Sequence, residues 1–188
     1  LHQKSWDFNL KAVAAGAGSY DLVDMLERVK NNPTFAYPAY LAFILLSYNY
    51  TYDWNMAPEK LFQPEVAQKI KESKNSMSFH LNTALPKNID KMFSEEFYNS
   101  LKKNDNNKVS EAIQKNTLSG WRPDFPLKLF HGSGDEVIPY ENSVKIYNDF
   151  KENGSKEIEL IKINNGTHGS SLLPMLKMII PWFESLKN

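Results

Sequence analysis

Two neighbouring stretches near the end of the chain decide the fold: PLKLFHGSGDEVIPYENS (126–143) and IELIKINNGTHGSS (158–171). Each begins with a run that predicts a β-strand and continues into a glycine-containing loop. The first loop carries Asp135 and the second carries His168. Because an acid and a histidine are suited to proton transfer, these two residues are the candidate functional site.

The segment between the two strands predicts a helix. In YENSVKIYNDFKENG (140–154) apolar residues recur at helical spacing, and a glycine ends the pattern. A strand at 126–132, this helix and a strand at 158–163 make one right-handed crossover unit of a parallel sheet. His168 lies 33 residues after Asp135, the length of one such unit. Both side chains are therefore expected at the sheet edge where the strands' carboxyl ends lie.

A third parallel strand is predicted at LKAVAAGA (10–17), and a closing helix near 171–187 that can bend at Pro181. The strands at 10–17 and 126–132 are apolar runs ended by glycine, which is typical of strands covered on both faces. The strand at 158–163 alternates more and could lie at a sheet edge. We therefore expect an α/β fold with about three parallel strands and flanking helices.

The middle of the chain, residues 21–122, contains no convincing strand. Prolines punctuate several helical patterns; SEEFYNSLKKN (94–104) begins with a serine N-cap, and KVSEAIQKN (108–116) is another short helix. An insertion of roughly a hundred residues is too long for a simple crossover. We interpret it as a helical lid over the strand ends, between a strand segment at 1–20 and an α/β part at 123–188.

The acid and the histidine together favour a hydrolytic mechanism. A histidine that accepts a nucleophile's proton must be held in one tautomer and stabilised when positively charged, and a carboxylate on the adjacent strand end does both. Alternatives exist for each residue: Asp135 could be a turn residue, and His168 a structural loop histidine. Glu136 is a second candidate acid, and His131, inside the strand, is interpreted as structural. Two histidines receive no role: His2 and His80.

These segments resemble the C-terminal half of an α/β-hydrolase, and are most similar to bacterial lipase- and esterase-like members with a helical lid. KAVAAGAGSYDL (11–22) is similar to the strand and turn after the nucleophile helix, although Ser19 replaces a proline of the relatives. WRPDFPLKLFHG (121–132) with the following SGDEVIPYENS resembles the segment of the triad acid, and NGTHG (165–169) resembles the histidine loop. The resemblance implies a serine hydrolase that cleaves small-molecule or lipid esters without a cofactor or metal.

The resemblance implies that the nucleophilic serine is not among these residues. In this family the serine comes first, on a strand-to-helix elbow with the pattern G-x-S-x-G, which does not occur in the 188 residues. Residues 1–3 are expected to be the last turn of the helix after that elbow. Asp135 and His168 would then be two-thirds of a triad, and the chain alone would be inactive. Four other serines lie on no such elbow and are interpreted as turn or cap residues: Ser19, Ser133, Ser170 and Ser171.

A sheet of only the last three strands would expose the edge that should pair with the nucleophile strand. An unpaired strand edge invites pairing with another chain. We therefore expect as partner either the N-terminal half of the same protein or a second copy of this chain.

The composition gives no support for several other classes of partner. Lys plus Arg and Asp plus Glu both number 22, which gives no support for nucleic acid or an anionic membrane. Without cysteine there are no disulfides, thiolate zinc sites or cysteine nucleophile. The longest apolar run, AYLAFILL (39–46), is too short to span a bilayer. The N-terminus has no signal-peptide pattern and no initiator Met, so the compartment stays open, with a secreted or periplasmic parent possible.

Three other functions remain as alternatives. A serine peptidase of the same fold would carry the same triad, because the triad does not report which acyl group is attacked. A nucleotide-binding domain is suggested by the G-x-G in VAAGAGSYD (13–21), although the third glycine of that motif is absent. A non-catalytic binding or structural domain would explain the missing serine directly.

Overall fold

The computed structural model describes residues 9–73, 79–103, 105 and 107–187; the expectations for His2 and for residues 1–3 lie outside them. The chain divides into two compact units. One, the α/β unit, combines the N-terminal residues through Asp21 with the residues from Leu118 onward. The other, the helical unit, is Leu22–Thr117. Each has its own cluster of buried hydrophobic side chains.

The α/β unit is built on a parallel sheet of three strands in the order β1-β2-β3. The strands are β1 (Val13–Gly16), β2 (Leu127–Gly132) and β3 (Ile158–Ile163). Both strand pairs are parallel and in continuous register, so all three carboxyl ends lie at one edge. This confirms the parallel α/β sheet predicted from the sequence, with β3 as an edge strand.

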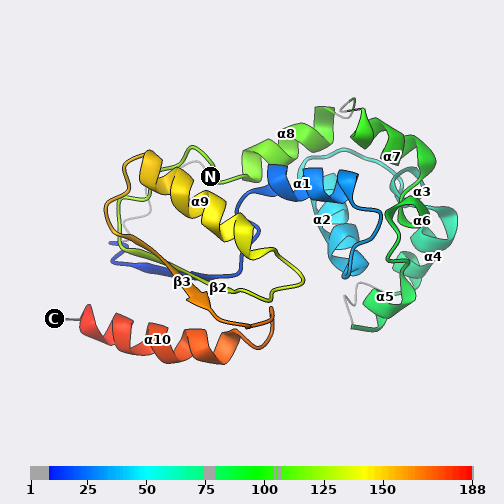
Figure 1. Cartoon of the computed structure of the whole chain (residues 1–188). Helices are drawn as coiled ribbons and strands as arrows, with labels where there is room; N and C mark the ends of the chain where they lie inside the picture. The colour runs from blue at the N-terminus through cyan, green and yellow to red at the C-terminus, as the bar shows by residue number, and fades with distance from the viewer. Residues whose placement is uncertain (1–8, 74–78, 104, 106, 188) are drawn as a thin grey trace. The chain divides into compact units, whose positions relative to one another are not determined.

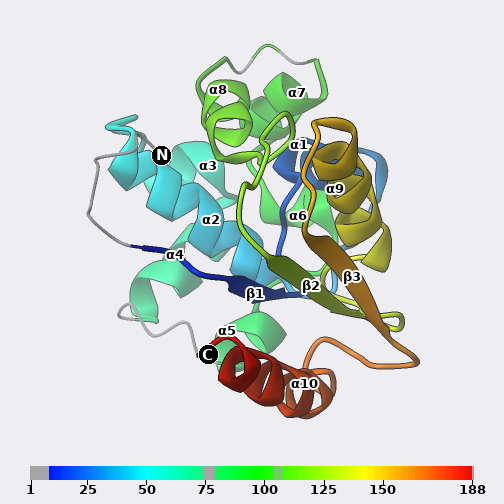
Figure 2. The ribbon, with the colours of Figure 1, turned by 90° about the vertical axis from the view of Figure 1, so that its left-hand side faces the viewer.

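Two helices cover opposite faces of this sheet (Figures 1 and 2). Helix α9 (Tyr140–Glu152) connects β2 to β3, and α10 (Leu172–Ser185) follows β3. Gly154, just after α9, has a φ of +90°, which fits its expected role in ending the helix. A Cβ atom at Gly16 would lie 2.4 Å from the sulfur of Met175, so the Met175 side chain of α10 occupies the space that a side chain at position 16 would take.

The strands differ in burial. Strand β2 is almost wholly buried, whereas the first three residues of β1 are only partly buried and Gly16 is exposed. The expectation that both strands are covered on both faces is therefore correct for β2 and wrong for β1. Among the described residues β1 has a strand on one side only, so its other side lacks the neighbour that would bury it.

The helical unit consists of short helices. They are α1 (Leu22–Asn31), α2 (Pro38–Thr51), α3 (Pro58–Leu61), α4 (Pro64–Glu72), α5 (Phe79–Ala84), α6 (Ile89–Met92), α7 (Glu95–Lys102) and α8 (Asn107–Asn116). Prolines begin α2, α3 and α4, where the missing N–H costs nothing. Ser94 caps α7 as expected, since its Oγ accepts the N–H of Phe97.

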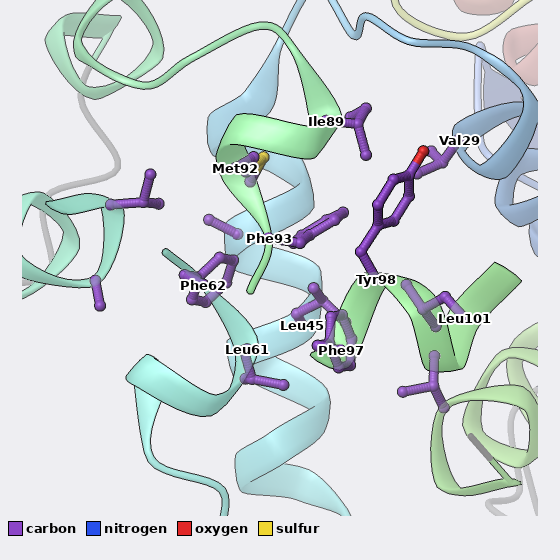
Figure 3. Close-up of a cluster of buried hydrophobic side chains, with 14 of the residues drawn as sticks. Val29, Leu45, Leu61, Phe62, Ile89, Met92, Phe93, Phe97, Tyr98 and Leu101 are labelled. Carbon is purple, nitrogen blue, oxygen red and sulfur yellow. The ribbon is translucent and has the colours of Figure 1, made fainter. Parts of the chain in front are cut away.

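A hydrophobic cluster holds the helical unit together (Figure 3). Phe93 lies in it, with its ring centroid 6.0 Å from that of Phe62, 5.6 Å from Phe97 and 6.2 Å from Tyr98. Phe62 is fully buried and Phe93 is 2% exposed. This ring packing stabilises a unit whose helices are short.

The chain segments that lead into and out of the helical unit lie side by side within the α/β unit. The N–H of Leu118 donates to the carbonyl of Tyr20 at 2.9 Å. The fully buried Asn142 of α9 holds the same segment: its Oδ1 accepts the N–H groups of Tyr20 and Asp21 at 2.9 and 3.2 Å, and its Nδ2 donates to the Asp21 carbonyl at 2.9 Å. Lys145 adds an ion pair with Asp21 at 2.6 Å.

Candidate active site

Asp135 lies in the tight loop that follows β2. Its Oδ1 accepts the backbone N–H groups of Val137 and Ile138, both at 2.9 Å. This is the self-turn that aspartate favours, and it holds the carboxylate against the loop. The side chain of Asp135 has no exposed surface, so the carboxylate depends on protein donors in place of water.

His168 lies in the loop that follows β3 and meets Asp135. Its Nδ1 is 2.8 Å from Asp135 Oδ2. Because an ionised carboxylate only accepts, Nδ1 carries the hydrogen, and in the neutral ring Nε2 is left as the accepting nitrogen. The side chain of His168 is 37% exposed. A buried acid therefore orients a histidine that other molecules can reach.

Backbone hydrogen bonds join the two loops to each other. The N–H of Ser133 donates to Ile163 at 2.9 Å, and the N–H of Gly134 donates to Gly166 at 3.0 Å. The hydroxyl of Ser133 accepts the N–H of Asn165 at 2.9 Å. The loops thus behave as one rigid piece, which fixes the distance between the acid and the histidine.

Glycines allow this close approach. A Cβ atom at Gly132 would lie 2.1 Å from the carbonyl oxygen of Gly166, and one at Gly166 would lie 2.3 Å from Ser171 Oγ. No side chain fits in those spaces. Gly132 and Gly166 are therefore required by packing between the loops.

A second histidine also contacts the acid. His131 of β2 is fully buried; its Nε2 is 3.3 Å from Asp135 Oδ2 and 2.9 Å from the carbonyl oxygen of Ile138. Its Nδ1 is 2.6 Å from Ser143 Oγ. The sequence interpretation treated His131 only as structural and missed this contact. A histidine near the end of a largely apolar strand, four positions before the acid, was the available signal.

A pocket of about 330 Å³ opens beside His168 at the carboxyl ends of the strands. Its lining includes Ala17, Phe130, Leu172 and Met175. Ala17, directly after β1, has a φ of +43°, an unusual conformation for a residue with a side chain. The lining is largely apolar, so the reachable histidine faces a surface suited to hydrocarbon groups.

The other candidates are not part of this arrangement. Glu136 is exposed, unlike its neighbour Asp135, and His80 is an exposed residue of α5 in the helical unit. Ser170 Oγ accepts the N–H of Thr167, and the hydroxyl of Ser171 donates to the Thr167 carbonyl. These are the local loop contacts expected for turn residues, whereas Ser133 contacts Asn165 of the neighbouring loop.

Two kinds of structural feature are absent from the described residues. No group of three or more His, Asp or Glu side chains there is arranged to hold a metal ion. In the same part of the chain, no helix has both the length and the apolar composition needed to cross a bilayer.

The model of the secretory lipase family matches residues 7–186. Among curated relatives, secreted triacylglycerol lipase LIP2 of Malassezia globosa is 26% identical over 159 residues, 82% of this chain and 34% of the relative. The rice cell wall degrading esterase LipA of Xanthomonas oryzae has a TM-score of 0.72 at 22% identity, over 94% of this chain and 50% of the esterase. A Legionella pneumophila protein assigned as a hydrolase has a TM-score of 0.78 at 21% identity, over 97% of this chain and 50% of its own.

The chain therefore spans about a third of the curated relative and about half of these solved structures. The structural likeness establishes the fold, an α/β-hydrolase sheet, as the resemblance in the sequence implied.

Proposed function

This chain belongs to the secretory lipase family, and from that premise we propose that it is the C-terminal part of a serine hydrolase that cleaves carboxylic esters. One observation carries the proposal: the 2.8 Å contact between the reachable His168 and the buried Asp135. The two residues come from neighbouring strand ends, in the order acid then histidine that the family's triad requires.

The roles follow from the geometry. With Nδ1–H donated to Asp135, Nε2 of His168 is free to take the proton of a serine hydroxyl as that oxygen attacks the ester carbonyl. The resulting imidazolium is stabilised by the charge of Asp135. His168 then returns the proton to the leaving alcohol, and the same cycle with water releases the acid.

The nucleophilic serine is assigned to residues outside this sequence. The 188 residues contain no G-x-S-x-G, and the hydroxyls of Ser133, Ser170 and Ser171 make local loop contacts. The backbone N–H of the residue after that serine, one donor of the oxyanion hole, would come with it. The chain alone is therefore expected to be inactive toward esters.

The free side of β1 is where the missing part would join. Within the described residues β1 pairs only with β2, so it presents an unpaired edge beside the pocket at His168. We assign that edge to the N-terminal half of the same protein, with a second copy as the alternative. A folded monomer without a second chain, measured by size-exclusion chromatography with light scattering, would contradict both.

Substrate and location are proposed from the relatives. The Malassezia protein is named a secreted triacylglycerol lipase, and the pocket beside His168 is largely apolar. The relative's name and the apolar pocket favour esters with hydrocarbon acyl groups. The relative's name also favours a secreted parent protein. Activity on peptide substrates without activity on esters would replace this assignment with a peptidase of the same fold.

The test uses the longer natural polypeptide that contains this chain. His168→Ala and Asp135→Asn should each lower kcat for a p-nitrophenyl ester by roughly 10³- to 10⁴-fold, while both variants keep the wild-type circular dichroism spectrum. Glu136→Gln, a change at the exposed neighbouring acid, should leave kcat within about twofold. Equal losses from Glu136→Gln and Asp135→Asn would refute the assigned acid.

A separate measurement tests the missing nucleophile. A fluorophosphonate probe should label the longer polypeptide at a serine and leave the 188-residue chain unlabelled. Stoichiometric labelling of a serine in the chain alone would show that the nucleophile is present after all.

A further inference from the structure

We propose that His131 is a positioning residue for the acid: as a neutral donor to the Ile138 carbonyl it closes the loop that holds the Asp135 carboxylate toward His168, and Ser143 sets its tautomer. The inference rests on the proposed function, because it assigns a role within the same Asp135–His168 pair. His131 is a third residue beside this pair. It belongs to strand β2, and its side chain lies on the face of the sheet opposite the pocket.

The first step concerns the proton on His131 Nε2. That nitrogen is 2.9 Å from the carbonyl oxygen of Ile138 and 3.3 Å from Asp135 Oδ2. Both oxygens can only accept, so Nε2 must carry the hydrogen. That N–H is donated to the Ile138 carbonyl and lies beside the carboxylate.

The second step concerns the charge on His131. Its Nδ1 lies 2.6 Å from the hydroxyl of Ser143, which is also fully buried. With Nε2–H donated on one side, Nδ1 can accept the Ser143 hydrogen on the other, and the neutral ring is satisfied at both nitrogens. A neutral ring also avoids placing a second full charge in a fully buried site.

The neutral state matters for Asp135. A protonated His131 would cancel the charge of the carboxylate and weaken its stabilisation of an imidazolium at His168. A neutral His131 orients the carboxylate and leaves its negative charge in place. The other titratable groups near the ring are Tyr140, whose ring lies edge-on with centroids 5.7 Å apart, and Lys162, whose Nζ is 5.3 Å from the Tyr140 centroid.

The third step is the set of hydrogen bonds on the carboxylate. Oδ1 accepts from Val137 and Ile138, while Oδ2 faces His168 and His131. Ile138 donates its N–H to Asp135 and accepts from His131 through its carbonyl. The loop is thereby closed on His131, and the carboxylate cannot rotate without breaking contacts on both oxygens.

Two amide variants separate positioning from simple packing. In His131→Gln the terminal NH₂ reaches about as far as Nε2 and can donate to the Ile138 carbonyl beside Asp135. In His131→Asn the amide reaches only as far as Nδ1, so it can bond Ser143 but not the Ile138 carbonyl. The two side chains carry the same functional group, and they differ in reach and by one methylene.

The measurements are histidine-selective ¹⁵N NMR and ester kinetics on the longer polypeptide. In the wild type we expect His131 as the neutral Nε2–H tautomer, and a deshielded, slowly exchanging Nδ1 proton on His168. His131→Asn should broaden or lose that His168 signal and lower kcat about tenfold with KM unchanged. His131→Gln should retain the signal and keep kcat within about threefold.

The outcomes are distinguishable from failure of the proposed function. A wild-type protein without the His168 signal would refute the Asp135–His168 pair itself, and the proposed function with it. A normal His168 signal that His131→Asn leaves unchanged would overturn only this inference, as would equal loss of activity in the Asn and Gln variants. A charged His131 at neutral pH would overturn it as well.

Discussion

The two units of this protein are stabilised in different ways. In the helical unit the described residues that form the buried core are hydrophobic. In the α/β unit the buried set also includes polar or charged residues: Asp21, His131, Asn142, Ser143, Ser155 and Ser171. Apolar burial is non-directional and tolerates many arrangements, whereas buried hydrogen bonds require particular positions. The precise geometry of the candidate site therefore depends on the unit that has both.

The largest expected effect tests the apolar side of this comparison. Phe93→Ala in the helical unit should lower the free energy of unfolding by about 3–5 kcal/mol, because it removes a buried ring and leaves a cavity. Urea denaturation followed by circular dichroism measures this, with amide exchange of α7 as the local reporter. Tyr50→Ala, at a residue 87% exposed, is the control and should change the stability by less than about 0.5 kcal/mol. Similar losses from both variants would contradict the assigned core.

The next effect tests the polar side. Asn142→Ala should cost about 2–4 kcal/mol, because it leaves the N–H groups of Tyr20 and Asp21 and the Asp21 carbonyl without their buried partner. The same denaturation experiment applies. Asn153→Ala, at the exposed C-cap of the same helix, should cost well under 1 kcal/mol. A cost for Asn142→Ala below that of Asn153→Ala would show that the buried amide is dispensable.

A third effect is visible only at alkaline pH. Burial raises the pKa of Tyr20 from 10.0 to about 12. Since the unfolded chain loses this proton first, the stabilisation from Tyr20 is complete below pH 10 and is lost as the pH rises toward 12. Relative to Tyr20→Phe, the wild type should lose roughly 2 kcal/mol over this window.

Unfolding curves of the wild type and of Tyr20→Phe at a series of pH values measure this difference. Parallel pH dependence of the two proteins would mean that Tyr20 titrates normally.

The smallest effect tests a helix cap in the helical unit. Ser94→Ala removes the acceptor for the Phe97 N–H and the donor to the Lys60 carbonyl, and should cost about 1 kcal/mol. Ser94→Asp keeps the capping acceptor and loses only the donor, so it should recover part of that cost. An Asp variant less stable than the Ala variant would mean that the Lys60 contact dominates.

The strands and the helices α7, α8, α9 and α10 were predictable because their signals are local. The apolar runs ending in glycine, the serine at the start of α7 and the glycine after α9 act on residues a few positions away. The contact between Asp135 and His168 was predictable for a related reason: the crossover rule brings successive strand ends to one edge.

Other contacts had no such rule behind them. Asn142 holds a segment 121 residues earlier in the chain, and nothing in YENS indicates that partner. The contact between His131 and Asp135 depends on how the loop after β2 closes, and there the Asp135 carboxylate accepts from Val137 and Ile138. Strand β1 is only partly buried, and among the described residues it has a strand on one side only. Each was decided by tertiary packing and not by periodicity.

The single hydrogen bond between Leu118 and Tyr20 has a consequence for how such proteins diversify. Because the chain leaves and re-enters the α/β unit at adjacent backbone positions, a short turn could bridge them with little entropic cost. The segment Leu22–Thr117 can then be exchanged as a whole. Evolution, or a protein engineer, could swap it for a longer or shorter one, while the loops that carry Asp135 and His168 keep their geometry.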